Sequence, residues 1–330
     1  MRAKVLALAA LLAASAGAAE ANETFKDWWT TCDNTRDCAA FGFSELSDEV
    51  MGYLKVTRAA AADAQPAAKI AIYADDGPWT LSVDGRFIAA VNAKGEDGAA
   101  ASADLTPAQS AALVAAAARG TWLEVASAGR PVGRISLAGS AAALRWMDDR
   151  QKRAGTVTAI LAKGPARTVP PPPEAPLVRA APAVAQSDLP KTPPPSVLTA
   201  TRDCEDHARD LDVDPVVGRL SPQLTLWAPL CSHGAYNLIY RLLVVDDRGA
   251  RPAPIRYPGQ AKDESDLMNI EYDAATQTLS NFDKGRGLGD CGATTEWVWD
   301  GARFTPKGQN LMGECRGVPP DDWPSSYRTR

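Results

Sequence analysis

The chain has 330 residues, a formal net charge of −5 and a hydrophobic content of 45%. This length is sufficient for two domains of ordinary size, and the apolar content allows each of them to bury a core. The acidic balance argues against nucleic acid and against an anionic membrane surface as the main partner.

Residues 1–21 have the pattern of a secretory signal peptide. Arg2 and Lys4 give a positive start, an apolar run covers about residues 5–14, and small residues lead to a predicted cleavage site near Ala21. The apolar run is well short of the roughly 20 residues that span a bilayer, so we expect a cleaved leader and not a membrane anchor. The sequence therefore predicts a periplasmic or secreted protein with no membrane span.

Residues 166–200 form a proline-rich segment that divides the chain. They contain ten prolines and no aromatic residue, a composition that favours extended backbone and cannot build a core. We expect a semi-rigid linker that reaches up to about 100 Å, at roughly 3.1 Å per residue. The predicted organisation is a first domain at 22–165, the linker at 166–200 and a second domain at 201–330. The pattern leaves open whether the two domains dock on each other.

Two cysteines precede the linker and four follow it. An even number of cysteines in an exported chain indicates disulfides, and pairing across a long linker is entropically costly. In the second half the count alone leaves three pairings open. The set that we favour joins Cys32 to Cys38, Cys204 to Cys231, and Cys291 to Cys315. The spacing fits neither a zinc site nor a Cys-X-X-Cys redox motif, so we expect no metal and no cofactor.

The first domain has the pattern of an α+β fold, an antiparallel sheet with two helices. Period-two apolar runs predict strands near residues 54–60 and 69–74, and Asp84-Gly85 predicts a hairpin turn. A helix is expected to begin at Thr106, with Gln109 completing a capping box.

The second helix of the first domain is expected over residues 140–153, with Asp148 and Arg153 on its outer face, and residues 156–164 are expected to form a closing strand. Trp28 and Trp29 are sequence neighbours in a strand, so they point to opposite faces and we expect at most one of them in the core.

The first half also resembles a known family. Its opening FKDWWTTCDN, followed by CAAF, WLEV and RISLAGSAAAL, is similar to the invasion-associated locus B family of exported bacterial proteins over residues 24–165. The resemblance implies a role at the host interface and no catalytic residue.

The second domain is expected to be rich in β-strands and stabilised by its two disulfides. It contains LCSHGAYN, KGRGLGDCGATTEWVWDGARF, a later GEC and a terminal DWPSSYRT. With the six cysteines, these segments resemble the domain-of-unknown-function family 1176 over the full mature chain. The family has no assigned activity, so this resemblance implies no site.

A hydrolase site is one interpretation of the residues around the first cysteine pair of the second half. His207 and His233 lie near several carboxylates, and Ser232 is a possible nucleophile. Two observations weigh against catalysis: Ser232 and His233 are strand neighbours that point to opposite faces, and the chain has no G-x-S-x-G motif.

A calcium loop is the interpretation suggested by Asp210, Asp212 and Asp214. Pro215 stands where such a loop needs glycine, and Ser221 where it needs a bidentate glutamate. A solvated acidic loop is therefore the expectation.

A ligand-facing patch is suggested by Lys284, Arg286, Asp290, Trp297 and Trp299, in and after the glycine-rich stretch at residues 285–292. No helix follows these glycines, so a phosphate-binding loop is not expected. The two tryptophans share one face of a strand, and core packing is the competing interpretation for them.

The sequence thus predicts a non-enzymatic binding or envelope-interaction protein whose partner is an envelope or host protein, with no nucleic acid. The alternatives are a hydrolase that uses His207 and His233, and an inhibitor or adaptor that presents the loop from Gly285 to Gly292. We expect the adaptor hypothesis to hold only if this loop protrudes with Arg286 facing outward. The oligomeric state is left open.

Overall fold

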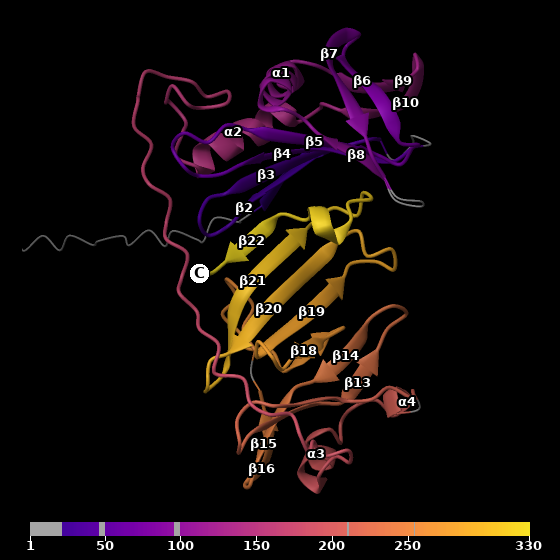
Figure 1. The fold of residues 1–330 in the computed structure, drawn as a ribbon, viewed down its shortest axis with the longest axis vertical. Helices are drawn as coiled ribbons and strands as arrows, with labels where there is room; N and C mark the ends of the chain where they lie inside the picture. The colour runs from indigo at the N-terminus through magenta and orange to yellow at the C-terminus, as the bar shows by residue number, and fades with distance from the viewer. Residues whose placement is uncertain (1–21, 46–49, 96–99, 210, 254) are drawn as a thin grey trace, which may run out of the picture.

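The computed structural model describes residues 22–45, 50–95, 100–209, 211–253 and 255–330. These residues are mostly β, with few helices. Their strands form antiparallel sheets that follow one another along the long axis of the molecule (Figure 1). The predicted α+β class is therefore correct in its antiparallel sheets, while the helices contribute little. No helix in the described ranges is long and apolar enough to cross a membrane.

The N-terminal unit has two sheets and two helices. One sheet has the strand order β1-β2-β3-β4-β5-β8 and the other β10-β9-β6-β7. The elements are β1 (Asn22–Phe25), β2 (Trp28–Cys32), β3 (Cys38–Phe43), β4 (Gly52–Arg58), β5 (Ala67–Ile72), β6 (Gly77–Val83), β7 (Arg86–Ala93), β8 (Ala101–Asp104), α1 (Pro107–Ala117), β9 (Trp122–Ser127), β10 (Arg130–Ser136) and α2 (Ser140–Arg150).

Local sequence signals decide several of these elements. Helix α1 begins at the expected capping box, in which the Gln109 amide donates to the Thr106 hydroxyl at 3.3 Å and the Thr106 amide donates to Gln109 Oε1 at 2.9 Å. Asp84 and Gly85 turn strand β6 into β7 with φ of 49° and 76°, which is the left-handed backbone that a tight hairpin needs.

The end of helix α2 differs from the prediction. Asp148 and Arg153 are fully buried and do not face solvent. The Asp148 carboxylate accepts hydrogen bonds from the backbone amides of residues 160, 161 and 162 at 2.7, 2.8 and 3.0 Å and pairs with Arg58 at 3.3 Å. Residues 156–164 form turns and not the expected closing strand, because this carboxylate satisfies the amides that a strand partner would otherwise take.

The prediction that at most one of Trp28 and Trp29 lies in the core is wrong. Both are buried, with 0% and 2% of their surface exposed. They do belong to different packing layers. Trp28 lies in the core of the N-terminal unit, and Trp29 lies in a cluster with residues of the last strands. The six-stranded sheet is therefore covered on both faces, which its local sequence does not reveal.

The C-terminal unit contains three antiparallel sheets. Their strand orders are β11-β12-β15-β16, β13-β14-β17 and β18-β19-β20-β21-β22. The elements are α3 (Pro195–Ala200), α4 (Asp206–Arg209), β11 (Val216–Arg219), β12 (Thr225–Ala228), β13 (Leu230–His233), β14 (Leu238–Arg241), β15 (Leu243–Asp246), β16 (Gly249–Pro252), β17 (Asp266–Met268), β18 (Glu271–Asp273), β19 (Thr278–Lys284), β20 (Gly292–Trp299), β21 (Phe304–Met312), the 3-10 turn η1 (Pro320–Asp322) and β22 (Ser325–Arg328).

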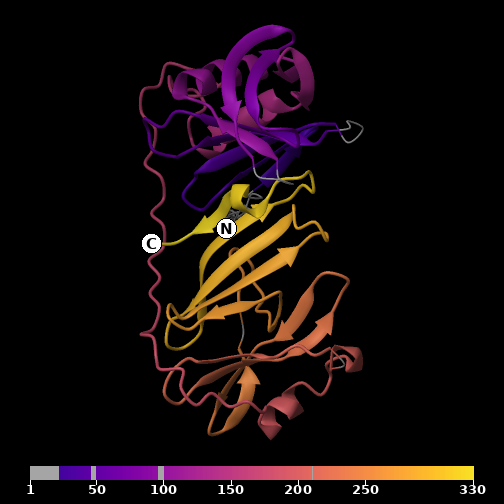
Figure 2. The same ribbon diagram turned by 45° about the vertical axis from the view of Figure 1, so that its right-hand side comes forward.

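Residues 167–194, which we call the strap, run in extended form along the side of the C-terminal unit (Figures 1 and 2). The strap is hydrogen-bonded to the body of the protein. The Val178 amide donates to the Arg330 carbonyl at 3.1 Å, the Arg330 amide donates to the Pro176 carbonyl at 2.9 Å, and the Ala181 amide donates to the Trp299 carbonyl at 2.7 Å. The last residues of the predicted linker fold into helix α3, which buries Val197.

The two units dock through an aromatic cluster at the face of the six-stranded sheet. Trp29, Phe41 and Tyr53 pack there with Trp323 and Met312 of the C-terminal unit. Figure 2 shows the five-stranded sheet directly beneath the N-terminal unit. The question that the linker left open is therefore answered: the two halves form one continuous body.

Polar contacts complete this junction. The Asp322 carboxylate accepts hydrogen bonds from Lys69 Nζ at 2.7 and 2.8 Å and from the Tyr53 hydroxyl, and Lys55 Nζ donates to the Asp322 carbonyl at 2.8 Å. Burial opposes the charge of Asp322, but the bonds from Lys69 and Tyr53 outweigh it and lower the pKa of this carboxyl.

Arg328 makes a second set of polar contacts at the junction. Its guanidinium pairs with Asp33 and, at 2.9 Å, with Asp37. Both carboxylates belong to the small loop that the Cys32–Cys38 disulfide closes. The chain terminus is thereby attached to the first strands of the protein.

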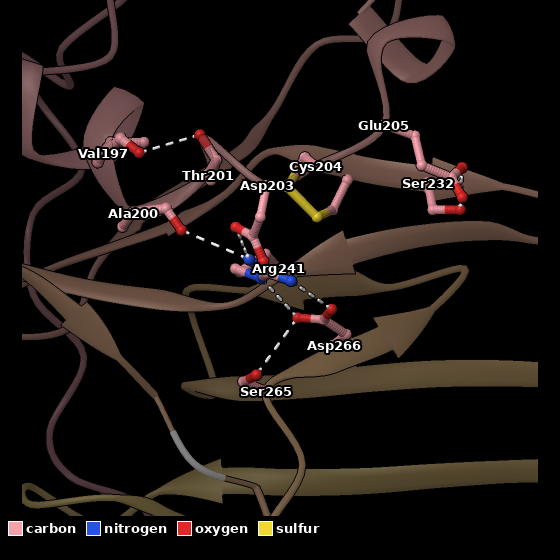
Figure 3. Close-up of a disulfide and its surroundings, with 11 residues drawn as sticks. Val197, Ala200, Thr201, Asp203, Cys204, Glu205, Ser232, Arg241, Ser265 and Asp266 are labelled. Carbon is pink, nitrogen blue, oxygen red and sulfur yellow. Dashed lines mark hydrogen bonds and ion pairs between the residues drawn. A yellow bond between two sulfur atoms is a disulfide. The ribbon is translucent and has the colours of Figure 1, made fainter.

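Three disulfides account for all six cysteines, and each stays within one unit. They join Cys32 to Cys38, Cys204 to Cys231, and Cys291 to Cys315, which are the pairs that the sequence favoured. The Cys204–Cys231 bridge ties the acidic entry segment to strand β13 (Figure 3).

Candidate functional site

The loop of residues 285–292 connects strands β19 and β20 at the end of the five-stranded sheet. The Gly285 amide donates to the Cys291 carbonyl at 2.9 Å, and the Gly289 amide donates to the Arg286 carbonyl at 2.9 Å. Gly292 has φ of 127°, and a Cβ atom there would lie 1.9 Å from the Asp283 carbonyl oxygen. The glycines therefore permit a compact turn and not a phosphate cradle, in agreement with the strand that follows.

An internal ion pair holds this loop in one conformation. Arg286 Nε and an Arg286 terminal nitrogen contact the two Asp290 carboxylate oxygens at 2.7 and 2.5 Å. Burial opposes the charge of Asp290, but Arg286 and the Gly317 amide, which donates at 2.7 Å, lower the pKa of this carboxyl. The adjacent Cys291–Cys315 disulfide fixes the end of the loop. The loop is thus held both by an ion pair and by a covalent bridge.

Leu288 lies exposed at the middle of this rigid loop. Its side chain is 74% exposed, the highest value among the large exposed hydrophobic residues of the described chain. Tyr236, which is 43% exposed, donates a hydrogen bond from its hydroxyl to the Gly285 carbonyl at 3.2 Å. Lys284 and Arg286 both precede Leu288 in the chain, and Arg286 pairs with Asp290. The loop therefore presents an exposed apolar side chain, and an exposed aromatic residue is bonded to its first residue.

The predicted patch is only partly assembled. Lys284, Arg286 and Asp290 do lie in or next to the loop, and the Arg286 side chain is 39% exposed. Trp297 and Trp299 are 0% and 2% exposed and lie in the core of the C-terminal unit. The tryptophans share one face of strand β20, as expected, but that face packs inward, so they offer no surface to a ligand.

The hydrolase arrangement is not seen in the described residues. The Ser232 hydroxyl donates to the Glu205 carboxylate at 2.6 Å, and His233 Nδ1 lies 3.3 Å from the Gly234 carbonyl oxygen (Figure 3). The nucleophile that we considered is therefore bonded to a carboxylate, which does not take its proton as an imidazole base would. The side chain of His207 lies outside the described part of the structure.

Arg241 organises the charged residues beside the Cys204–Cys231 disulfide (Figure 3). Its guanidinium contacts both Asp266 oxygens at 2.9 Å and Asp203 at 2.6 Å, so its donors are used within the protein. These bonds, led by the bond to Asp266, raise the pKa of Arg241 above its ordinary value. This cluster ties Asp203 of the entry segment to strands β14 and β17.

The described part of the acidic run contains two of its three aspartates. Asp210 lies outside the described residues, and Asp212 and Asp214 are exposed. In the described ranges no group of three His, Cys, Asp or Glu side chains is placed to hold a metal ion.

Sequence reasoning singled out the loop but missed Leu288 and Tyr236. A signal for Leu288 was present, since it stands between Gly287 and Gly289 in a polar stretch where no periodic pattern calls for an apolar residue. No local signal identifies Tyr236, which reaches the loop from the turn between strands β13 and β14.

The family comparison covers the whole described chain. A model of the protein family of unknown function DUF1176 matches residues 22–330. The chain belongs to this family. The uncharacterised protein YpfG of Escherichia coli K12 is 30% identical to this chain over 95% of the chain and 94% of that relative. No solved structure matches. The full-length resemblance is therefore confirmed, and the similarity of the first half to the invasion-associated locus B family stays a prediction.

Proposed function

We propose that this DUF1176 protein is an exported, non-enzymatic binding protein that contacts an envelope or host protein through the 285–292 loop. The observation that carries the proposal is the exposure of Leu288, 74%, on a loop that a disulfide and an ion pair already fix. A preformed loop binds with a small entropic cost, and an exposed apolar side chain beside an aromatic ring is typical of an interface anchor.

Export is supported by the cysteines and by the first residues of the sequence. All six cysteines are paired, and structural disulfides persist in oxidising compartments. The leader pattern of residues 1–21 agrees with this location. N-terminal sequencing of the protein recovered from the cell envelope should give a start near residue 22.

The adaptor interpretation is favoured over the hydrolase by specific contacts. The adaptor hypothesis requires Arg286 to face outward. The Arg286 side chain is 39% exposed, and it also pairs with Asp290. The hydrolase would need Ser232 beside an imidazole, whereas its hydroxyl contacts Glu205. The loop is therefore the better candidate for function.

A substitution at the loop tip tests the proposal. We expect Leu288→Asp to reduce capture of the envelope partner at least about tenfold, because a carboxylate would have to be desolvated in an apolar pocket. The measurement is affinity capture from an envelope extract with the full chain as bait. Leu198→Asp is the matched control, since Leu198 is 58% exposed on helix α3, away from the loop.

The result is decided by the difference between these two variants. Partners lost from Leu288→Asp and retained by Leu198→Asp would support the loop as the contact. The same partners recovered with wild type and Leu288→Asp would show that binding occurs elsewhere. Unchanged circular dichroism would establish that both variants fold.

A further inference from the structure

A polar groove lies over one face of the sheet β18–β22, separate from the tip of the 285–292 loop. Its volume is about 530 Å³, within the range of roughly 300–1,000 Å³ that is usual for small-ligand sites. Eight of its lining residues are Asn, Gln, Ser or Thr, and the others are two Glu, one Arg, one Gly, Phe282 and Tyr327. No aliphatic side chain lines it, whereas most small-ligand sites are lined mainly by apolar groups.

The strand register brings a row of polar side chains onto this face. Ser280 lies opposite Glu271 on one neighbouring strand and opposite Glu296 on the other, and Thr294 lies opposite Asn310. Residues paired in this way across antiparallel strands point to the same side of the sheet. The row therefore crosses four strands, from β18 to β21.

Much of this row has hydrogen-bonding capacity to spare. In the described chain the side chains of Ser280, Thr294 and Asn310 make no hydrogen bond to another residue. Asn281 and Thr295 also border the groove, but they are buried, and the Thr295 amide donates to Asn281 Oδ1 at 3.0 Å. The free donors and acceptors are thus those of Ser280, Thr294 and Asn310.

The charged and polar residues in the groove disfavour both anionic and apolar ligands. Glu271 carries negative charge, Glu296 pairs with Lys307 at 2.9 Å, and Arg328 already pairs with Asp33 and Asp37. An anionic ligand would therefore meet repulsion without a free cation to offset it. An apolar ligand would leave the hydroxyl and amide groups without partners, which costs free energy at each group.

An extended peptide is also a poor fit. Peptides recognised by sheets bind at an edge through main-chain hydrogen bonds. The groove lies on a face, where the main-chain groups of β19, β20 and β21 are used in the ladders of the sheet. A face of this kind offers side chains only.

We infer that this groove binds a short neutral oligosaccharide. Sugar hydroxyls both donate and accept, and they match the amide and hydroxyl side chains of Ser280, Thr294 and Asn310. The faces of sugar rings are apolar C–H surfaces, which the ring of Phe282 can cover; this ring lines the groove and packs edge to face against Trp323. The site is independent of the protein partner proposed for the loop.

Binding of defined sugars to the full chain tests this inference. The probes are chitotriose, cellotriose and maltotriose, measured by saturation-transfer NMR and by calorimetry. We expect at least one to bind wild type with a Kd of roughly 1 mM or tighter, the affinity of a weak specific complex. Asn310→Ala should weaken that binding about two- to tenfold through the loss of its hydrogen bonds, and Ser280→Trp should abolish it by filling the groove.

The control is Asn92→Ala, which makes the same change at an exposed strand position of the N-terminal unit. It should leave affinity unchanged, as should Leu288→Asp, so that failure of the loop proposal and failure of this one are distinguishable. Binding of none of the three probes to wild type would overturn the inference. Unchanged affinity in Asn310→Ala would also overturn it, and this criterion applies even if Ser280→Trp does not fold. Preferential binding of a neutral peptide over the sugars would overturn it as well.

Discussion

Asp322 joins the two units through polar contacts with three side chains, those of Tyr53, Lys55 and Lys69. Its side chain is 12% exposed, and it bonds to Lys69 and to Tyr53 across the junction. Burial also acts on its neighbours, since it raises the pKa of the Tyr53 hydroxyl and lowers the pKa of Lys55. A carboxylate in such surroundings stabilises the fold only while it is charged.

Replacement of this carboxylate should therefore weaken the protein. We expect Asp322→Asn to lower the free energy of unfolding by about 2 kcal/mol, because two lysines and a hydroxyl lose their charged partner. Urea unfolding at neutral pH measures the change. Asp321→Asn is the matched control, since its side chain is exposed and should change little.

The pH dependence of the difference between wild type and Asp322→Asn provides a second check. The pKa of Asp322 is lowered in the folded state, so its contribution is complete above its ordinary pKa of 3.8 and is lost as pH falls through the folded value. The free energies of unfolding of the two proteins should differ fully at pH 5 to 7, because the carboxyl of the unfolded chain is charged above about pH 4. The two values should converge in stronger acid. A constant difference at all pH values would contradict this role.

At the scale of elements, the 285–292 loop depends on covalent and ionic supports. Cys291 and Cys315 are 24 positions apart in sequence. Replacing both by serine should cost about 3 kcal/mol of stability, because the unfolded chain regains loop entropy. Amide hydrogen exchange in the loop should also become faster, since Arg286 and Asp290 are then held only by their own ion pair.

The matched control removes the Cys204–Cys231 disulfide, whose sequence separation of 27 is similar. This variant should lose comparable stability, while exchange in the 285–292 loop stays as in wild type. Equal acceleration of loop exchange in both variants would mean that global stability, and not the neighbouring bridge, controls the loop.

Elements with a local cause were predictable from the sequence. The capping residues Thr106 and Gln109 and the turn at Asp84-Gly85 act on their own neighbours in the chain, and the structure places both as expected. Asp148 was misjudged because its partners are backbone amides twelve to fourteen residues away, in a segment without periodicity. A local pattern indicates which residues can form a helix or strand, but it does not indicate which distant residues pack over that element.

The sequence likewise predicted part of the candidate site and not the rest. Glycines and a cysteine identify the 285–292 loop, because each has a local backbone or covalent consequence. The burial of Trp297 and Trp299 depends on the core that forms on the other side of strand β20. The polar groove could not be predicted, since it needs the register of four strands that no short segment specifies.

At the scale of the whole molecule, the strap and the chain terminus support each other. Arg330 bonds to Pro176 and Val178 through its main chain and to Ala175 through its side chain at 3.1 Å. The burial of Trp29 arises at the same scale, because its covering residues lie nearly 300 positions later. Composition alone indicated a semi-rigid linker and left the docking of the two halves open, because these contacts join residues that are far apart in the sequence.

Limited proteolysis tests this support. Removal of Arg330 should accelerate trypsin cleavage after Arg179 several-fold, because Val178 and Pro176 lose their hydrogen-bond partners. Cleavage after Lys191, in the same strap but away from the terminus, is the internal control and should not change. Equal rates at Arg179 in both proteins would show that the contacts of Arg330 do not hold the strap.

The contacts of residues 322–330 also impose an order on folding. Asp322 and Trp323 cover the first sheet, Arg328 reaches the Cys32–Cys38 loop, and Arg330 holds the strap. These residues are synthesised long after the first sheet, whereas N-terminal units generally fold first. The aromatic face around Trp29 therefore lacks its full cover until residues 322–330 have been made. A chain without these residues would leave an apolar face of the first sheet open to association with other apolar surfaces.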